Sequence, residues 1–406
     1  MRIAMVTDYY LPTLGGVQTA IKAQSEMLRA AGHEVTVFCP LAQPSQDPHV
    51  VALPAAKFFR PDGYPLTIGT GRATAIMKRE FAERKIDVVH TNSELFASLA
   101  GVRAARFHNL PIVHTMHGRA DVYAQSVLPL PHLVSGPLAR IHGRHASAKG
   151  IKIRRDLHYT KTATARRMWR MLLAQARLSA HVIVPSSHFH DKFLAQGIET
   201  PSTVMSNTLE ESVREKIGEP VPRKLKPGEP MRVIWVGRLS PEKRPDIFAR
   251  AVAQVGGDKI DAHIYGEGMH RREVEKVGGP AVLHGSVPQH QVLAAMRDAH
   301  LLVSTSYDFD NQPMVMLEAV ASGLPVMFCD PDLAEVVPDG AGFLSETPEA
   351  AGLAASLQAL LDNPAEIARA SAAAIAGRER VFSDCRELEK IYAEVLAGHD
   401  TADSAA

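Results

Sequence analysis

Two successive series of short apolar segments alternate with amphipathic ones along this chain, and this pattern limits the fold more than any other feature. The apolar segments are continuous rather than alternating, which is typical of strands in a parallel sheet covered by helices on both faces. The first series lies between Arg2 and His117, and the second lies between Met231 and Asp330. We therefore predict an α/β protein built from two doubly wound, Rossmann-like domains in tandem, with a cleft between them.

The length and the composition fit this plan. At 406 residues the chain is too long for one ordinary core, and its 46% of apolar and 22% of charged residues are average for globular proteins. Several prolines and charged residues between Pro201 and Pro230 indicate a connection between domains. We predict an N-terminal domain over residues 1–205, a C-terminal domain over 206–380, and a segment 381–406 whose helix packs back toward the N-terminal domain before a frayed tail.

The two ends of the chain and its cysteines carry few signals of their own. The amino terminus has one basic residue and a short apolar run before Asp8, which is not the layout of a secretory signal. No stretch approaches the roughly 20 apolar residues of a membrane-spanning helix. The three cysteines are isolated, and no nearby acid or cysteine completes a metal set with the paired histidines. We therefore expect a cytoplasmic protein without a disulfide framework and without metal ligands.

Functional residues are expected in the loops beyond the carboxyl ends of the strands, where open α/β sheets bind their ligands. In the first half, Gly15 and Gly16 lie directly before a helix in "GGVQTAIK". Backbone N–H groups at such a helix start can approach a phosphate. A tight turn from strand to helix needs the same glycines, so both interpretations stay open.

The second half has two cations in the corresponding loop. Arg238 and Lys243 follow the strand Val233–Val236 in "VGRLSPEKRPD". Cations at such a sheet edge can hold a diphosphate and neutralise the negative charge that grows as a phosphate leaves. The alternative is an ordinary solvated loop.

Two carboxylates stand eight positions apart in "SYDFDNQPMVMLEAVASGLPV". Asp310 lies on the loop after the strand "LLVSTS", and Glu318 lies in a helix that ends at Gly323. Because both can face the same space, we interpret them as acceptors of hydrogen bonds from sugar hydroxyls. The alternatives are a loop cap for Asp310 and a surface or ion-paired position for Glu318.

As a set, these segments resemble the retaining glycosyltransferases of family four over nearly the whole length. The resemblance is carried by the "GG" loop, "VVHTN", "PIVHTMHG", "VIVPSS", "VGRLSPEK", "IYGEG" and the two spaced acids before "GLPV". It implies the GT-B fold of two facing Rossmann-like domains and the retaining transfer of a hexose from a sugar nucleotide. The element "SYDFDNQPMVMLEA" is also similar to that of diacylglycerol glucosyltransferases, which implies a lipid or glycolipid acceptor.

The resemblance also implies roles for single residues. Arg238 and Lys243 would bind the donor diphosphate and stabilise the departing nucleoside diphosphate. Glu318 would hold the ribose hydroxyls, whereas Asp310 and His117 would contact the transferred hexose. The other implied donor-binding residues are Gly15, Gly16, Gly237, Gln312, Pro313, Met314 and Val315, several of them through their backbone.

In this family the donor's own phosphate oxygen takes the acceptor's proton, so neither an enzymic base nor a metal cofactor is expected. The family usually has glutamate where this chain has Asp310 and a glycine-bearing loop where it has "NQP". The hexose, and the choice between Asp308 and Asp310 as its contact, therefore stay open. UDP-glucose is the first expectation for the donor and GDP-mannose the second. A sugar-nucleotide-binding protein without turnover is the alternative.

A basic segment lies between Arg140 and Arg177, with eleven Lys or Arg residues and one acid, although the net charge of the chain is only +1. Residues 164–178 predict a helix with arginines around an apolar stripe. Such a helix suits an anionic bilayer and a peripheral position at the cytoplasmic membrane face. Alternatively, the stripe packs on the sheet, and no nucleic-acid partner is expected. The stripe consists of Trp169, Leu172, Leu173 and Ala176.

Overall fold

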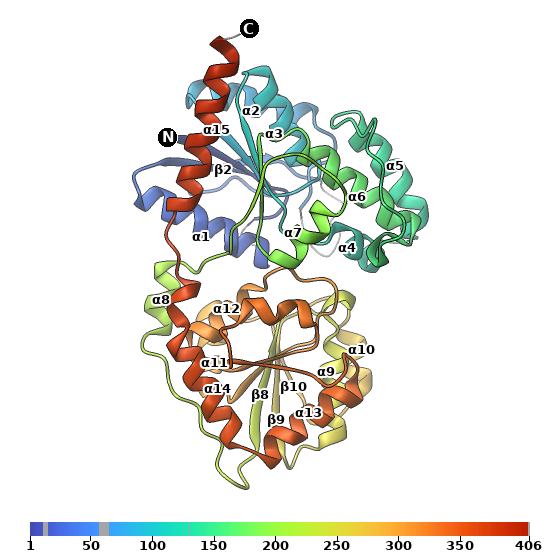
Figure 1. Cartoon of the computed structure of the whole chain (residues 1–406), viewed down its shortest axis with the longest axis vertical. Helices are drawn as coiled ribbons and strands as arrows, with labels where there is room; N and C mark the ends of the chain where they lie inside the picture. Colours follow the sequence, from blue (N-terminus) through green and yellow to red (C-terminus); the bar gives the residue numbers. More distant parts are fainter. Residues whose placement is uncertain (11–14, 57–64, 129, 405–406) are drawn as a thin grey trace. The chain divides into compact units, whose positions relative to one another are not determined.

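The computed structural model describes residues 1–10, 15–56, 65–128 and 130–404. These residues form two compact units, each with its own sheet and apolar core (Figure 1). Unit 1 comprises Met1–Ser206 together with Asp384–Ala406, and unit 2 comprises Asn207–Ser383.

Unit 1 contains a seven-stranded sheet in the order β3-β2-β1-β4-β5-β6-β7, and every neighbouring pair is parallel. Alternate residues of β1 face two separate apolar layers: Ile3 and Met5 belong to one layer, Ala4 and Val6 to the other. Helices therefore cover both faces, as continuous apolar strands require. The strands are β1 (Arg2–Val6), β2 (Glu34–Leu41), β3 (Val50–Pro54), β4 (Val88–Thr91), β5 (Ile112–Thr115), β6 (His181–Val184) and β7 (Ser202–Val204).

The helices of unit 1 include the last one of the chain. This helix, α15, buries Leu388 and Tyr392 in the layer that also contains Ile3, and the Tyr392 hydroxyl lies 2.7 Å from His90 Nδ1. The helices are α1 (Gly16–Ala30), α2 (Gly71–Glu83), α3 (Phe96–Phe107), α4 (Ala120–Val127), α5 (Pro131–Gly143), α6 (Ala163–Ala176), α7 (Ser187–Leu194) and α15 (Arg386–Ser404), with the short 3-10 helix η2 (His158–Thr160).

Unit 2 contains a six-stranded sheet in the order β10-β9-β8-β11-β12-β13, again parallel throughout. Its strands are β8 (Met231–Val236), β9 (Ile260–Tyr265), β10 (Val282–Gly285), β11 (Leu301–Ser304), β12 (Val326–Phe328) and β13 (Gly342–Leu344). Its helices are α8 (Glu211–Ile217), α9 (Pro245–Val255), α10 (Arg271–Val277), α11 (Gln289–Asp298), α12 (Met314–Ala321), α13 (Ala350–Asp362) and α14 (Ala365–Ala376), with the 3-10 helices η3 (Pro241–Lys243), η4 (Pro331–Val336) and η5 (Arg378–Val381).

The predicted fold class is confirmed by the two parallel sheets, and two details differ from the sequence analysis. The segment predicted as a connection between Pro201 and Pro230 contains the edge strand β7 and the helix α8. The tail expected to fray from Gly398 is helical as far as Ser404. His399 Nε2 donates a hydrogen bond to the carbonyl of Asn109 at 2.7 Å, which fastens this part of α15 to the end of α3.

Candidate active site

The loop after β8 in unit 2 holds Arg238 in one orientation. Arg238 Nη2 donates to Glu242 Oε1 at 2.8 Å, and the Ser240 hydroxyl donates to the same oxygen at 2.6 Å. The Glu242 side chain is fully buried, whereas the Arg238 side chain is 22% exposed. A buried carboxylate thus fixes a partly exposed guanidinium at the carboxyl end of the first strand, where a preorganised cation can meet an anion.

Two glycines after β9 set the position of this loop. A Cβ on Gly266 would lie 1.8 Å from the carbonyl oxygen of Gly237, and one on Gly268 would lie 2.2 Å from that of Leu239. The Leu239 N–H also donates to the Glu267 carbonyl at 2.9 Å. The glycines of "IYGEG" therefore allow this segment to contact the backbone of the loop after β8. The motif alone did not show why glycine is needed at these two positions.

Lys243 and Asp310 come from different loops and meet in unit 2. Lys243 Nζ donates to both carboxylate oxygens of Asp310, at 2.6 and 2.7 Å. The Thr305 hydroxyl, just beyond β11, donates to the Lys243 carbonyl at 2.8 Å and ties the two loops together. Asp310 is therefore ion-paired and is not a loop cap. An ammonium has three N–H groups, so one N–H of Lys243 is left for another acceptor.

Glu318 is buried within α12 and hydrogen-bonded. Its Oε1 accepts from Gln289 Nε2 at 2.7 Å, at the start of α11. Burial raises the pKa of Glu318 to about 7, and the Gln289 hydrogen bond opposes this shift. Glu318 thus occupies neither the surface nor the ion-paired position considered from the sequence. A buried carboxylate with one amide partner has lone pairs left for hydroxyl donors.

The remaining candidates of unit 2 surround the start of α12. Pro313 precedes this helix, and Met314 and Val315 are its first two residues, whose N–H groups have no acceptor within the helix. Gln312 Oε1 accepts from the Asn207 N–H and fixes the approach to the helix. Gly237 directly follows the strand β8 and donates its N–H to the Tyr265 carbonyl at 3.0 Å.

In unit 1, Gly15 and Gly16 lie at the start of α1. Gly15 is the cap residue in extended conformation, and a Cβ there would lie 2.6 Å from Gln18 Oε1. The Gly15 carbonyl accepts the Thr19 N–H at 3.1 Å. The preceding residues 11–14 lie outside the described part of the chain. The position supports the tight turn, and phosphate binding by Gly16 stays a prediction.

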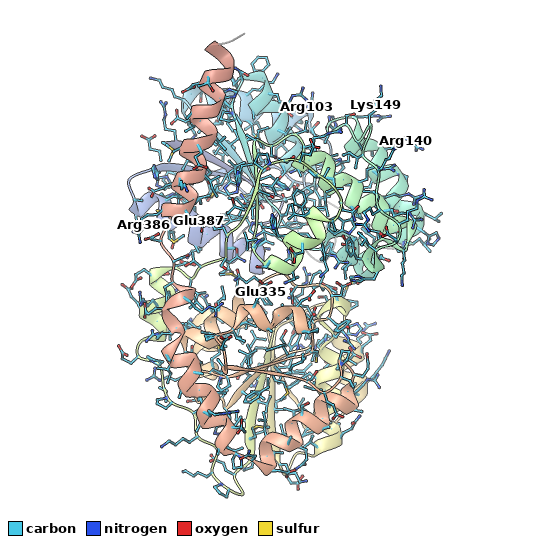
Figure 2. All side chains as sticks on the ribbon, in the orientation of Figure 1. Arg103, Arg140, Lys149, Glu335, Arg386 and Glu387 are labelled. Carbon is cyan, nitrogen blue, oxygen red and sulfur yellow. The ribbon has the colours of Figure 1, made fainter. Side chains whose placement is uncertain are left out.

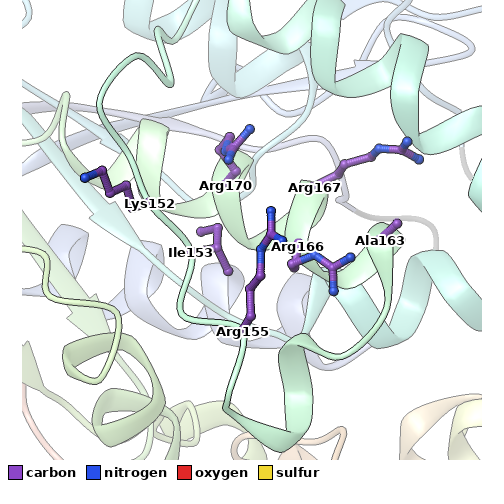
Figure 3. Close-up of a pocket in the computed structure, with 7 residues that line it drawn as sticks. All are labelled: Lys152, Ile153, Arg155, Ala163, Arg166, Arg167 and Arg170. Atoms are coloured by element: carbon purple, nitrogen blue, oxygen red, sulfur yellow. The ribbon is translucent and has the colours of Figure 1, made fainter.

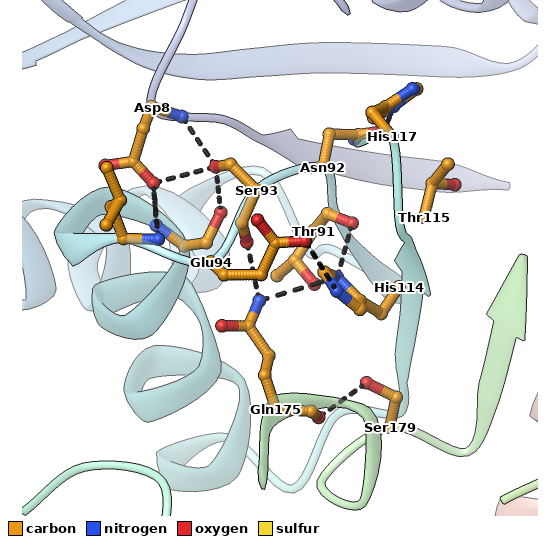
Figure 4. Close-up of polar contacts among 12 residues, drawn as sticks. Asp8, Thr91, Asn92, Ser93, Glu94, His114, Thr115, His117, Gln175 and Ser179 are labelled. Carbon is orange, nitrogen blue, oxygen red and sulfur yellow. Dashed lines mark hydrogen bonds and ion pairs between the residues drawn. The ribbon is translucent and has the colours of Figure 1, made fainter. Parts of the chain in front are cut away.

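His117 follows β5 and contacts Asn92, which follows β4 (Figure 4). Asn92 Nδ2 donates to the His90 carbonyl at 3.3 Å, so its Oδ1 faces His117 Nε2 at 3.0 Å. Because Oδ1 can only accept, His117 carries its proton on Nε2 and its Nδ1 is an acceptor. Burial lowers the pKa of His117 to about 3, and the nearby His114 lowers it further. His117 is a neutral acceptor of hydrogen bonds, which suits a hydroxyl rather than an anion.

Asp8 is a structural centre of unit 1 that the sequence analysis treated only as the end of a strand. Its carboxylate accepts the N–H of Ala97 at 2.7 Å and the Ser93 hydroxyl at 2.7 Å (Figure 4). Burial raises its pKa to about 6. Asp8 thereby fixes the loop between β4 and α3. The same loop carries Glu94, whose Oε1 lies 3.6 Å from His114 Nε2.

The apolar stripe of α6 is not a membrane surface. Its four residues are fully buried in unit 1, and the Trp169 ring lies 4.8 Å from that of Tyr159. The alternative, a charged helix packed on the sheet, is therefore the structure of α6. Exposed apolar side chains occur instead on and just before α5. They are Leu130, Leu133, Val134 and Ile141.

The basic segment begins in the last turn of α5, at Arg140. Arg140 and Lys149 are both exposed, and they lie in the part of unit 1 built by α5 and the residues after it (Figure 2).

Among the described residues, no group of three or more His, Cys, Asp or Glu side chains could hold a metal ion. Of the helices described, none is both long and apolar enough to cross a membrane.

Comparisons with known families cover most of this architecture. Residues 14–212 match the model of "Glycosyltransferase Family 4", and residues 230–363 match that of "Glycosyl transferases group 1". The chain is a member of glycosyltransferase family 4. It is therefore a retaining glycosyltransferase that takes its sugar from a nucleotide sugar.

Relatives of known function are similar over most of the chain. A GDP-mannose-dependent alpha-mannosyltransferase of Mycobacterium tuberculosis is 26% identical over 81% of this chain and 79% of its own. An alpha-monoglucosyldiacylglycerol synthase of Streptococcus pneumoniae is 25% identical over 80% of this chain and 70% of its own.

A solved structure confirms the GT-B fold. The crystal structure of Anabaena HepE in complex with UDP has a TM-score of 0.66 and 16% identity, covering 98% of this chain and 100% of that one. This likeness concerns the fold alone, because the two sequences are so different.

Proposed function

We propose that this glycosyltransferase moves a hexose, with UDP-glucose as the first choice of donor, to a lipid or glycolipid acceptor at the cytoplasmic membrane face. The observation that supports the donor part is the ion pair of Lys243 with Asp310, because the segment after β8 that carries Lys243 also carries Arg238, which Glu242 holds in one orientation. Each of these cations can turn toward phosphate oxygens, and Asp310 can accept hydroxyls of the transferred sugar once Lys243 contacts the donor.

The proposed reaction depends mainly on position and charge. Arg238 and Lys243 stabilise the nucleoside diphosphate as it leaves, and Glu318 holds the ribose hydroxyls. His117, neutral and with Nδ1 as an acceptor, orients a hydroxyl of the hexose. The proton of the acceptor hydroxyl passes to a phosphate oxygen of the donor, so no side chain with a tuned pKa is needed as a base.

The acceptor part of the proposal is supported by the surface of α5. Leu133 is 60% and Ile141 37% exposed, on a helix that carries Arg140 and has Arg144 as its C-cap residue. An exposed apolar helix face with basic neighbours matches the chemistry of an anionic lipid interface. The likeness to a relative named for monoglucosyldiacylglycerol synthesis supports the same acceptor class and a glucosyl donor.

A panel of sugar nucleotides tests the donor. Purified protein is incubated with UDP-glucose, GDP-mannose and related donors, together with diacylglycerol or a glycolipid in mixed micelles, and release of nucleoside diphosphate is measured. We expect acceptor-dependent release with UDP-glucose. Transfer from GDP-mannose is the second candidate, because a relative is a GDP-mannose-dependent mannosyltransferase. Release of nucleoside diphosphate with GDP-mannose alone would establish this second candidate.

Vesicle co-sedimentation tests the membrane surface. The double variant Leu133→Ser/Ile141→Ser should lose binding to phosphatidylglycerol vesicles at low salt. The control is Leu194→Ser on α7, because Leu194 is 47% exposed and lies away from the basic segment in the sequence. Equal binding by both variants would remove α5 as the membrane surface.

A further inference from the structure

A pocket of about 420 Å³ in unit 1 is lined by five cations and no acid (Figure 3). It lies between the loop that carries Lys152 and Arg155 and the first half of α6, which carries three arginines. Its volume is within the usual range for small-molecule sites. The lining residues are Lys152, Ile153, Arg155, Ala163, Arg166, Arg167 and Arg170.

Two of the arginines are fixed by neutral groups, so their charge is not compensated. Arg166 Nη1 donates to the carbonyls of Thr160 and Lys161, at 3.0 and 2.6 Å. Arg167 Nη1 donates to the carbonyl of His132 at 2.8 Å and to the Ser135 hydroxyl at 3.0 Å. Carbonyl and hydroxyl acceptors orient a guanidinium while leaving its full positive charge available to an anion.

The other three cations have no partner of opposite charge. Within the described residues, neither a hydrogen bond nor an ion pair involves the side chains of Lys152, Arg155 or Arg170. The acid of this segment, Asp156, is already paired with Arg154 at 2.5 Å. Like charges gathered around one pocket repel each other, so an anion that enters it relieves this repulsion.

The pocket is connected to the loop that carries His117. Arg119, two residues after His117, lies over the ring of Tyr159 at 5.5 Å, and that ring contacts Trp169 of α6. Arg119 itself is held by a buried ion pair with Asp121 at 2.8 Å. Packed side chains thus join α6, the helix that carries three of the lining arginines, to the loop that carries His117.

We infer that this pocket is a binding site for a phosphate group, separate from the donor diphosphate site of unit 2. Guanidinium groups match the oxygens of a phosphate in pairs, and three of the lining arginines lie on α6. The phosphate belongs either to a lipid headgroup or to a small phosphorylated molecule. A role of this pocket in binding the acceptor rests on the proposed function, whereas phosphate binding by the pocket does not.

Titration calorimetry with inorganic phosphate tests the site. The full chain carries Arg238→Ala and Lys243→Ala as a background, so that the donor site does not contribute. In this background, Arg155→Gln/Arg170→Gln should weaken phosphate binding about tenfold, because charge-assisted hydrogen bonds are lost. Within the described residues these two exposed side chains form no hydrogen bond and no ion pair, so the fold should be unaffected.

The matched control removes the same charge elsewhere in unit 1. Arg72→Gln/Arg106→Gln replaces two exposed arginines of α2 and α3 and should leave phosphate binding unchanged. Equal affinity for phosphate in both double variants, or no saturable binding in their parent, would overturn the site.

The source of the phosphate is identified by competition. If the site recognises a lipid headgroup, phosphatidylglycerol vesicles displace inorganic phosphate, and glycerol 1-phosphate does so only weakly. If it recognises a small phosphorylated molecule, glycerol 1-phosphate displaces inorganic phosphate and phosphatidylglycerol vesicles do not. Because no donor is present, failure of the transferase proposal would leave these results unchanged, and failure of the pocket would leave the donor panel unchanged.

Discussion

The polar centres of the two units differ in charge. In unit 1, His117 is kept neutral by burial, and Asp8 is buried among N–H and hydroxyl donors with a pKa of about 6. In unit 2, Lys243 and Arg238 are charged, partly exposed and held by carboxylates. The neutral imidazole of His117 suits the hydroxyls of a sugar, whereas two cations suit a diphosphate. The same strand–loop–helix plan thus carries two kinds of chemistry.

Replacing a cation of unit 2 should have the largest effect. We expect Lys243→Ala to lower the transfer rate about 10²-fold, because leaving-group charge is no longer stabilised. The rate is measured as acceptor-dependent release of nucleoside diphosphate. Lys276→Ala, on the exposed surface of α10, is the control. Adding Asp310→Asn to Lys243→Ala should restore no activity. Full recovery would show that an unpaired Asp310, rather than the missing cation, caused the loss.

The buried acid of unit 2 should make donor affinity depend on pH. The pKa of Glu318 is raised to about 7, so the carboxylate is mostly neutral at pH 6 and ionised at pH 8. The ionised carboxylate accepts hydrogen bonds from two ribose hydroxyls, whereas the protonated carboxyl has one oxygen occupied by its proton. KM for the donor should therefore fall as the pH rises through 7. Glu318→Gln should raise KM about tenfold at pH 8 and remove the pH dependence. A wild-type KM that is constant from pH 6 to 8 would contradict this assignment.

The residue that positions Arg238 should have a smaller effect. Glu242→Gln keeps the size of the side chain but weakens its hold on the guanidinium, and we expect about a fivefold loss in kcat. Steady-state kinetics of Glu242→Gln and of the exposed control Glu273→Gln make the comparison. An unchanged kcat in Glu242→Gln would mean that Arg238 does not depend on this buried carboxylate.

The neutral centre of unit 1 should show the smallest effect. Asn92→Ala removes the acceptor that fixes the proton of His117 on Nε2, and we expect about a threefold rise in KM for the donor. Because His117 is neutral over the whole working range, its contribution should not vary between pH 6 and 8. A pH-dependent change in Asn92→Ala would show that the imidazole titrates, and the contrast between the two units would fail.

Local sequence patterns predicted most of the fold and part of the site. Continuous apolar segments indicated parallel sheets, because a strand that is buried on both faces has apolar residues at successive positions. The strands β7, β12 and β13 have three residues each, and of these only β12 lies in an apolar segment long enough to indicate a strand. The stripe of α6 was ambiguous, since a buried helix face and a membrane-binding face have the same spacing. Only tertiary packing distinguishes the two, and Trp169 is fully buried.

Contacts between distant residues explain what the sequence could not predict about the site. The pairing of Lys243 with Asp310 joins residues 67 positions apart, and no local pattern encodes it. The role of Gly266 became clear only from the backbone that runs 1.8 Å from its would-be Cβ. Asp8 carries no motif of its own, and its importance lies in the helix start that it binds. Residues that position other residues are therefore identified from the structure, whereas residues that belong to a family motif can be identified from the sequence.

The central claim is that the Arg238 loop of unit 2 stabilises the leaving diphosphate. Its most direct test is the rate of hexose transfer by Arg238→Ala, measured beside Arg272→Ala, which removes an exposed arginine of α10. We expect a loss of about 10²-fold or more in Arg238→Ala, with unchanged thermal unfolding, and normal transfer in Arg272→Ala. Normal transfer by a folded Arg238→Ala would contradict it.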